Sequence, residues 1–133
     1  MITGIAHNCY VVKNLETSIA FYELLGMTPA FDFLRESGER FGVYLHMGGR
    51  NFFELFVGEV TEVTGKPSYQ HVCLEVDDIH ATVADFRAKG IEVSDAKLGS
   101  DHSWQAWIAD PDGNRIELHY YTPESKQTPF LGL

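Results

Sequence analysis

Two histidines and two glutamates recur in the two halves of the sequence. His7 and His71 lie 64 residues apart, and Glu54 and Glu117 lie 63 residues apart. Two imidazole nitrogens and two carboxylate oxygens suit a borderline divalent ion such as Zn²⁺, Ni²⁺, Co²⁺, Mn²⁺ or Fe²⁺, and they leave positions for water or substrate. The four residues together predict one such ion per site.

Each of these four residues also has a simpler interpretation. A single histidine on a strand is more often packed or at the surface than a metal ligand, and Glu54 could pair with an arginine across a sheet. Glu54 lies in the apolar run NFFELFV, however, where burying an isolated carboxylate is costly unless a partner compensates its charge. The metal site is favoured because all four residues follow the same repeat.

The repeat extends over most of the chain. GIAHNCYVVKNLETSIAFYELLGM aligns with SYQHVCLEVDDIHATVADFRAKGI, and the tripeptide around Glu54 aligns with the tripeptide around Glu117. A fixed offset of this kind indicates a duplicated structural module. Any two strand-then-helix segments would share the apolar matches, but they would not share the paired His and Glu.

Each half has the sequence signals of one strand, one helix and three further strands. Asn14 and Asp78 are the predicted helix N-caps, and Gly26 and Gly90 stand where each helix should end. Turn-rich segments then separate stretches that we expect to be extended. These stretches lie near 28–36, 40–47 and 50–58 in the first half, and near 91–97, 103–110 and 114–121 in the second.

The fold class predicted from these signals is α+β, with two tandem βαβββ modules. At 133 residues the chain is expected to form a single domain, with a first module at 1–58, a second at 68–121 and an irregular tail at 122–133. Alternation along the strands places His71 with Cys73, and Glu117 with His119, on faces opposite the apolar residues. We expect the apolar faces to lie under the helices.

Charge and composition narrow the classes of partner. The net charge of −9 makes nucleic acid and anionic membranes poor partners. The sequence shows neither an apolar run long enough to span a bilayer nor a secretory signal, so the expected location is cytoplasmic. Cys9 and Cys73 are too few for a disulfide framework, and we expect each to be reduced and packed as a small apolar residue.

The same residues, in the same order, resemble the vicinal oxygen chelate superfamily, and within it the glyoxalase I (lactoylglutathione lyase) group. The likeness runs from GIAHNCYVVKN to ADPDGNRIELHYY, and its most specific part is the DPDGN-x-IEL segment. The resemblance implies a curved, cup-like mixed sheet with the helices outside, a homodimer, and a metal held by His7, Glu54, His71 and Glu117. Because all four ligand positions are filled, an enzyme is favoured.

By the same resemblance, the reaction is the isomerisation of a hemithioacetal of methylglyoxal and glutathione through an enediolate. Glu117 and Glu54 are then the candidates for general base and acid. One position departs from the family, because Val11 stands where an arginine often meets the glutathione carboxylate. An epimerase or dioxygenase acting on another substrate, or a protein that binds a small molecule without turnover, therefore remains open.

Other polar and aromatic residues are weaker candidates for substrate binding. His119 could contact substrate or simply support a metal ligand, and His102 lies in the surface-type loop GSDHSW. Aromatic side chains of the strands could wall an apolar pocket, although single aromatics in strands are more often core residues. These aromatics are Trp104, Phe52, Phe56 and Tyr69.

Overall fold

The computed structural model describes residues 1–132, which form two compact units. Unit 1 comprises Met1–Pro67 together with Asp110–Asp112, and unit 2 comprises Ser68–Ala109 and the chain from Gly113 onward. Each unit contains one mixed four-stranded sheet and one α-helix, which confirms the predicted pair of βαβββ modules. Of the predicted tail, Leu133 lies outside the described residues.

Unit 1 follows the predicted order of one strand, one helix and three strands. Its elements are β1 (His7–Val12), α1 (Leu15–Leu24), β2 (Thr28–Leu34), β3 (Arg40–Gly48) and β4 (Asn51–Val57). The sheet order is β1-β4-β3-β2, with β1 parallel to β4 and the other pairs antiparallel. The first and last strands of the module are therefore neighbours, and their side chains can meet.

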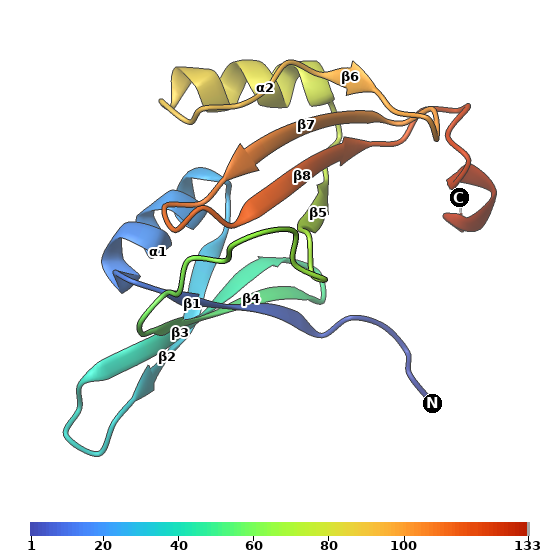
Figure 1. Ribbon diagram of the computed structural model, residues 1–133. Helices are drawn as coiled ribbons and strands as arrows, with labels where there is room; N and C mark the ends of the chain where they lie inside the picture. Colours follow the sequence, from blue (N-terminus) through green and yellow to red (C-terminus); the bar gives the residue numbers. More distant parts are fainter. Residues whose placement is uncertain (133) are drawn as a thin grey trace. The chain divides into compact units, whose positions relative to one another are not determined.

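Unit 2 repeats this arrangement (Figure 1). Its elements are β5 (Val72–Glu75), α2 (Ile79–Ala88), β6 (Lys97–Leu98), β7 (Trp104–Ala109), β8 (Arg115–Tyr120) and the short 3₁₀ helix η1 (Thr128–Phe130). The sheet order is β5-β8-β7-β6, again with the first strand parallel to the last. α2 lies along one face of this sheet, against β7 and β8.

Local sequence determines where both helices begin and end. The side chains of Asn14 and Asp78 accept hydrogen bonds from Thr17 N and Ala81 N, each at 2.9 Å. Gly26 and Gly90, which follow the helices, have φ of 95° and 81°, a region that favours glycine. The predicted caps and stops are thus confirmed.

No helix within residues 1–132 has the length and apolar character needed to cross a membrane.

The predicted alternation of the strands is also confirmed. In β4, Phe53 and Leu55 are buried, whereas Glu54 between them is only half-buried. In β8, Ile116 and Leu118 are buried on the side covered by α2, and Glu117 points to the other side. Each sheet therefore has one apolar face under its helix and one face that carries functional groups.

The strand predicted at 91–97 is largely absent, and β6 has only two residues. Ile91 and Val93 are buried as a strand would require, but ahead of β6 the segment is joined to β7 by the hydrogen bonds of Ser94. Ser94 N donates to Trp107 O, and Ser94 Oγ accepts from Trp107 N at 2.9 Å. The serine hydroxyl accepts the hydrogen bond that a backbone carbonyl would accept in a β-sheet, so a regular ladder of backbone hydrogen bonds does not form here.

The tail after residue 121, which was expected to be irregular, makes specific hydrogen bonds with the loop before β7. Ser125 is 3% exposed, and its hydroxyl accepts a hydrogen bond from Ser103 Oγ at 2.8 Å. Gln127 donates to Asp101 Oδ2, and Lys126 N donates to Asp101 O. The tail therefore supports the loop that precedes β7.

Candidate metal centre

In unit 1, His7 and Glu54 lie side by side on neighbouring parallel strands. His7 Nε2 is 3.6 Å from Glu54 Oε1, and the side chains are 38% and 18% exposed. The register pairs His7 with Phe52 and Cys9 with Glu54, so all of these side chains lie on the face away from α1. Two of the four predicted ligands thus lie together within unit 1.

Tyr44 of β3 orients the His7 ring. Its hydroxyl forms a hydrogen bond with His7 Nδ1 at 3.2 Å, and the two rings meet edge to face. Metal-binding histidines commonly use their second ring nitrogen in this way, because the bond fixes the ring and the tautomer. When Nδ1 carries the proton, the lone pair of Nε2 is directed toward Glu54.

In unit 2, His71 and Glu117 form the equivalent pair with a shorter contact. His71 Nε2 lies 2.9 Å from Glu117 Oε2, and the Glu117 side chain is 12% exposed. Trp107, which pairs with Glu117 across β7 and β8, packs edge to face against the His71 ring. The Arg115 guanidinium covers the same indole at 4.4 Å. The other two predicted ligands thus lie together within unit 2.

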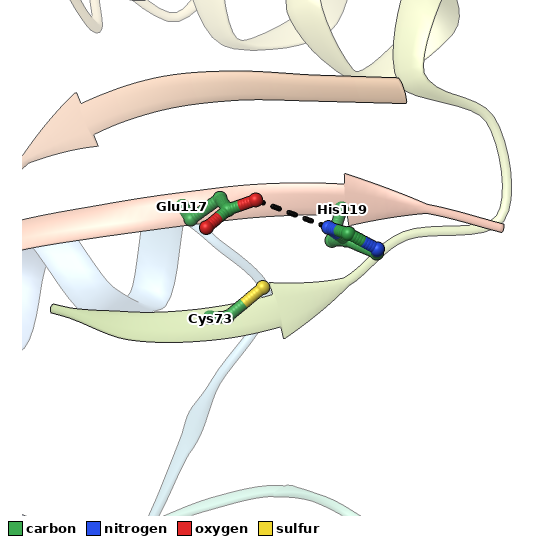
Figure 2. A group of neighbouring side chains, drawn as sticks. All are labelled: Cys73, Glu117 and His119. Atoms are coloured by element: carbon green, nitrogen blue, oxygen red, sulfur yellow. Dashed lines mark hydrogen bonds and ion pairs between the residues drawn. The ribbon is translucent and has the colours of Figure 1, made fainter. Parts of the chain in front are cut away.

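Glu117 has a further partner that Glu54 lacks. His119 is 8% exposed and donates through Nδ1–H to Glu117 Oε1 at 3.0 Å (Figure 2). Among residues 1–132 its buried Nε2 has no hydrogen-bond partner, and it lies 3.8 Å from Asp101 Oδ2. Cys73 of β5 points toward the same two side chains, and the ligand atoms of Cys73, Glu117 and His119 lie within 4.8 Å of one another.

Asp101 is held as a carboxylate beside His119. Gln127 Nε2 donates to its Oδ2 at 2.6 Å, and Ser103 N donates to its Oδ1 at 3.1 Å. The Gln127 hydrogen bond is the main reason that the pKa of Asp101 lies below its ordinary value. A chain of polar contacts therefore runs from the tail through Asp101 and His119 to Glu117.

The two cysteines are exposed rather than packed, so the expectation of two packed, apolar cysteines was wrong. They share strand faces with the acidic ligands instead of the core. Desolvation, followed by a hydrogen bond to Glu54, raises the pKa of Cys9 to about 11. Desolvation, followed by the charge of Glu117, raises the pKa of Cys73 to about 12. Both therefore remain thiols at neutral pH.

Two of the weaker candidates lie apart from the His71–Glu117 pair. Trp104 packs against His80 of α2, so it lies on the face of the sheet opposite Glu117. His102 is exposed in the loop before β7, where it adopts a φ of 65° and its carbonyl accepts from Thr122 Oγ1. Tyr69 is also exposed, whereas Phe52 and Phe56 flank Glu54 on β4.

Three supporting residues escaped the sequence analysis, namely Tyr44, Trp107 and Asp101. A signal existed for the first two, because 63 residues separate Tyr44 from Trp107, the same offset that relates Glu54 to Glu117. Both occupy the position opposite the glutamate on the neighbouring strand. Asp101 gave no such signal, because its role depends on the way the tail folds back onto its loop.

The residues of each unit fit a borderline divalent ion. Each unit brings one imidazole nitrogen and one carboxylate oxygen to within 3.6 Å or less on partly open strand faces. These are the donor types that such ions prefer, and supporting hydrogen bonds orient His7 in one unit and Glu117 in the other.

Comparison with known proteins assigns the chain to a family. The family description "Glyoxalase/Bleomycin resistance protein/Dioxygenase superfamily" matches residues 4–118. A "Probable lactoylglutathione lyase" of Vibrio parahaemolyticus is 34% identical, and the match covers 86% of this chain and 88% of that protein. A "Lactoylglutathione lyase" of Schizosaccharomyces pombe is 28% identical over 84% of this chain, which spans only 43% of that longer protein.

One solved structure with a similar architecture is named for a different role, the binding of an antibiotic. TnmS3, "an antibiotic binding protein from Streptomyces sp. CB03234", superposes with a TM-score of 0.74 and 26% sequence identity, covering 91% of this chain and 98% of that one. Both the sequence match and the architecture agree with the resemblance drawn from the duplicated His and Glu. The chain belongs to the Glyoxalase/Bleomycin resistance protein/Dioxygenase superfamily.

Proposed function

We propose that this protein is a metal-dependent lyase or isomerase of the lactoylglutathione lyase type. Its substrate would be a small molecule with two neighbouring oxygens, such as the hemithioacetal of methylglyoxal and glutathione. The observation that carries the proposal is the duplicated imidazole–carboxylate pair, His7 with Glu54 and His71 with Glu117. The name of the Vibrio relative, which is 34% identical, supports the same reaction type.

The two pairs are proposed to hold one divalent ion per site. When bound, the ion would polarise the neighbouring substrate oxygens and stabilise the negative charge that develops on them. The protein orients its ligands in advance, through Tyr44 at His7 and through His119 at Glu117. This preorganisation lowers the cost of ordering the site when the ion binds.

Proton transfer is assigned to the carboxylates. One glutamate oxygen takes a proton from a substrate carbon, and the proton is then returned to the adjacent carbon. Glu117 and Glu54 are proposed for these base and acid roles. Their surroundings differ, since Glu117 Oε1 accepts from the His119 ring whereas Glu54 interacts with the Cys9 thiol. The two glutamate variants should therefore have unequal effects on the pH profile of the reaction.

The test is a measurement of metal content followed by an assay. Wild type, Glu54→Gln and Glu117→Gln are loaded with Ni²⁺, Co²⁺ or Zn²⁺, dialysed and analysed for bound metal, and each loaded form is assayed with methylglyoxal plus glutathione. We expect about one ion per site in the wild type, weaker binding in both variants, and formation of the thioester product. Failure to bind any of the ions under any loading condition would refute the proposal.

A second candidate is a protein that binds a small molecule without converting it. The similarity to TnmS3, whose printed name is that of an antibiotic-binding protein, favours this function. It predicts a ligand that binds saturably and is recovered unchanged after prolonged incubation with the metal-loaded protein. Turnover of any substrate with two neighbouring oxygens, lost in Glu117→Gln, would decide for the enzyme.

A further inference from the structure

Unit 1 carries a continuous layer of aromatic rings on the strand face that holds His7 and Glu54. We call this layer the aromatic face and define it by Phe31, Phe33, Tyr44, Phe52 and Phe56. Tyr44 stacks on Phe31 at 4.9 Å and on Phe52 at 5.1 Å, and Phe33 contacts both Phe31 and Phe56. Every ring of the face therefore touches at least one other.

Strand register places these rings around the carboxylate of Glu54. Tyr44 is paired with Glu54 across β3 and β4, and Phe52 and Phe56 lie two residues before and after it on β4. The Phe56 ring extends over β3 at Gly42, where an added Cβ would come within 2.5 Å of the ring. The face is thus built closely around the His7–Glu54 pair.

The rings are not part of the buried core. Phe31 is 51% exposed, and the other rings of the aromatic face are half-buried despite their contacts with one another. Val11, on β1 beside this face, is 48% exposed as well. A contiguous apolar surface of this kind, with a polar pair within it, is typical of a ligand-binding site.

A pocket of about 300 Å³ opens at the edge of the aromatic face. Its walls include Tyr44, Phe52 and the N-terminal residues Thr3 to Ala6, and Arg50 is the charged residue among those that line it. This volume lies at the lower end of the range for small-molecule sites. It is large enough for a small compound with one or two rings.

The duplicated module does not require Phe52 and Phe56, the two phenylalanines that flank Glu54 on β4. At the offset that relates Glu54 to Glu117, Phe52 corresponds to Arg115 and Phe56 corresponds to His119. Unit 2 forms the same sheet with these polar residues flanking its glutamate. Forming this sheet therefore does not require phenylalanines beside the glutamate.

The polar pair within the face indicates the chemistry of the occupant. A purely apolar partner would bury the Glu54 carboxylate and the His7 imidazole without compensating polar groups, which is unfavourable. A planar ring stacked on Phe31, Tyr44 or Phe52, with oxygen atoms next to it, satisfies both kinds of surface. A small aryl compound with neighbouring oxygens meets these requirements.

We propose that the aromatic face binds an aryl group carried by the substrate, directly beside the two neighbouring oxygens. The inference rests on the proposed function for the role of His7 and Glu54, and it deepens that function by naming the substrate class. The class is aryl-substituted compounds with vicinal oxygens. The short methyl group of a methylglyoxal adduct would leave most of the aromatic face uncovered.

A matched pair of ligands tests this inference. Mandelate and lactate carry the same 2-hydroxy acid group and differ in having a phenyl or a methyl substituent. Their dissociation constants are measured by calorimetry on Co²⁺-loaded and on metal-free protein, for wild type, Phe31→Leu and Phe52→Leu. We expect mandelate to bind about ten-fold more tightly than lactate to the wild type, with this ratio falling several-fold in both variants.

The control is Phe130→Leu, which removes an 85% exposed phenylalanine from η1, outside the aromatic face. It should keep the wild-type ratio. Equal affinities for mandelate and lactate, or a mandelate preference that persists in both Phe31→Leu and Phe52→Leu, would overturn the inference. Circular dichroism confirms that the variants are folded, and the leucine side chains keep most of the apolar volume.

Two further readouts distinguish an aryl-binding face from a failed metal site and from a subunit interface. Absence of Co²⁺ binding would refute the proposed function, while the phenyl preference would still be tested on the metal-free protein. Sedimentation velocity reports whether the aromatic face instead joins two copies of the chain. Self-association lost in Phe31→Leu, together with equal binding of the two acids, would identify a subunit interface and overturn the inference.

Discussion

His119 Nδ1 lies 3.0 Å from Glu117 Oε1, while the other oxygen of the same carboxylate lies 2.9 Å from His71 Nε2. The two oxygens thus have separate partners, and the His119 bond fixes the orientation of the Glu117 side chain. His119 does not face the solvent, so it acts through Glu117. At the corresponding position beside Glu54, Phe56 offers no hydrogen-bond donor.

Replacing His119 should therefore weaken metal binding without removing a proposed ligand. The variant His119→Phe copies the residue found at the corresponding position of unit 1 and leaves Glu117 Oε1 without its N–H donor. We expect a 10- to 100-fold loss of affinity for Co²⁺, measured by titration and followed by visible absorption. His119→Asn retains an N–H near the position of Nδ1 and should recover part of the affinity.

The matched control for this substitution is His80→Phe, because His80 lies on α2 and contacts Trp104 on the opposite face of the sheet. It should bind Co²⁺ as the wild type does. Wild-type affinity in His119→Phe would show that the hydrogen bond to Glu117 has no part in holding the ion.

The two cysteines should react slowly with iodoacetamide at neutral pH. The pKa of Cys9 is raised to about 11 and that of Cys73 to about 12, so the thiolate fraction is small and grows about ten-fold with each pH unit below those values. Mass spectrometry of the two cysteine peptides after timed alkylation should show Cys9 reacting before Cys73 as the pH rises.

Glu54→Gln provides the control for the alkylation experiment. It removes the charge that helps to raise the pKa of Cys9, so Cys9 should react faster, whereas Cys73, which responds to Glu117, should not change. Alkylation of the wild-type cysteines at neutral pH with the rate of a small free thiol would contradict the raised pKa values.

The parts of the site that were predicted from sequence are those encoded by local pattern and by the repeat. The pairs His7–Glu54 and His71–Glu117 follow from strand alternation once the first and last strands of a module are neighbours. The caps at Asn14 and Asp78 depend only on adjacent residues, so the sequence was sufficient for them.

The parts that were not predicted depend on contacts between distant segments. Asp101 reaches His119 only because Gln127 and Ser125 fold back onto the loop before β7, and no periodicity in the tail indicates this. The expected strand at 91–97 was shortened because Ser94 Oγ bonds to Trp107 N in place of a backbone carbonyl. Apolar pattern alone cannot distinguish these two ways of burying Ile91.

The hydrogen bond between Tyr22 and Asp110 should contribute to the stability of unit 1. Tyr22 is fully buried, and its hydroxyl donates to Asp110 Oδ2 at 2.9 Å. Burial, followed by the charge of Asp110, raises the pKa of Tyr22 well above its ordinary value. Tyr22→Phe removes the donor and should lower the free energy of unfolding by about 1–3 kcal/mol in urea titrations.

A double-mutant cycle with Asp110→Asn isolates this interaction from the other contacts of either residue. The two substitutions should be less destabilising together than the sum of their separate effects. Strict additivity would mean that the hydroxyl and the carboxylate do not stabilise one another.

The tail should make unfolding more sensitive to acid through Asp101. The hydrogen bond from Gln127 holds the native pKa of Asp101 below its ordinary value, so the native state favours the carboxylate form. Stabilisation of this kind is complete above the unfolded pKa, near 4 on the usual scale, and is lost as the pH falls through the lower native pKa. Gln127→Leu should therefore destabilise the protein more at pH 6 than at pH 3, as measured by urea unfolding.

The control for the acid experiment is the Asp101→Asn background, in which no carboxylate titrates at this position. In this background, Gln127→Leu should lower the free energy of unfolding by the same amount at both pH values, because any remaining effect of the glutamine is packing or a neutral hydrogen bond. If the difference in free energy of unfolding between wild type and Gln127→Leu stays constant from pH 6 to pH 3, the tail supports the loop without acting on the Asp101 charge. If this difference becomes smaller at pH 3 only when Asp101 is present, the tail acts on the Asp101 charge and is thereby linked to the polar contacts that end at Glu117.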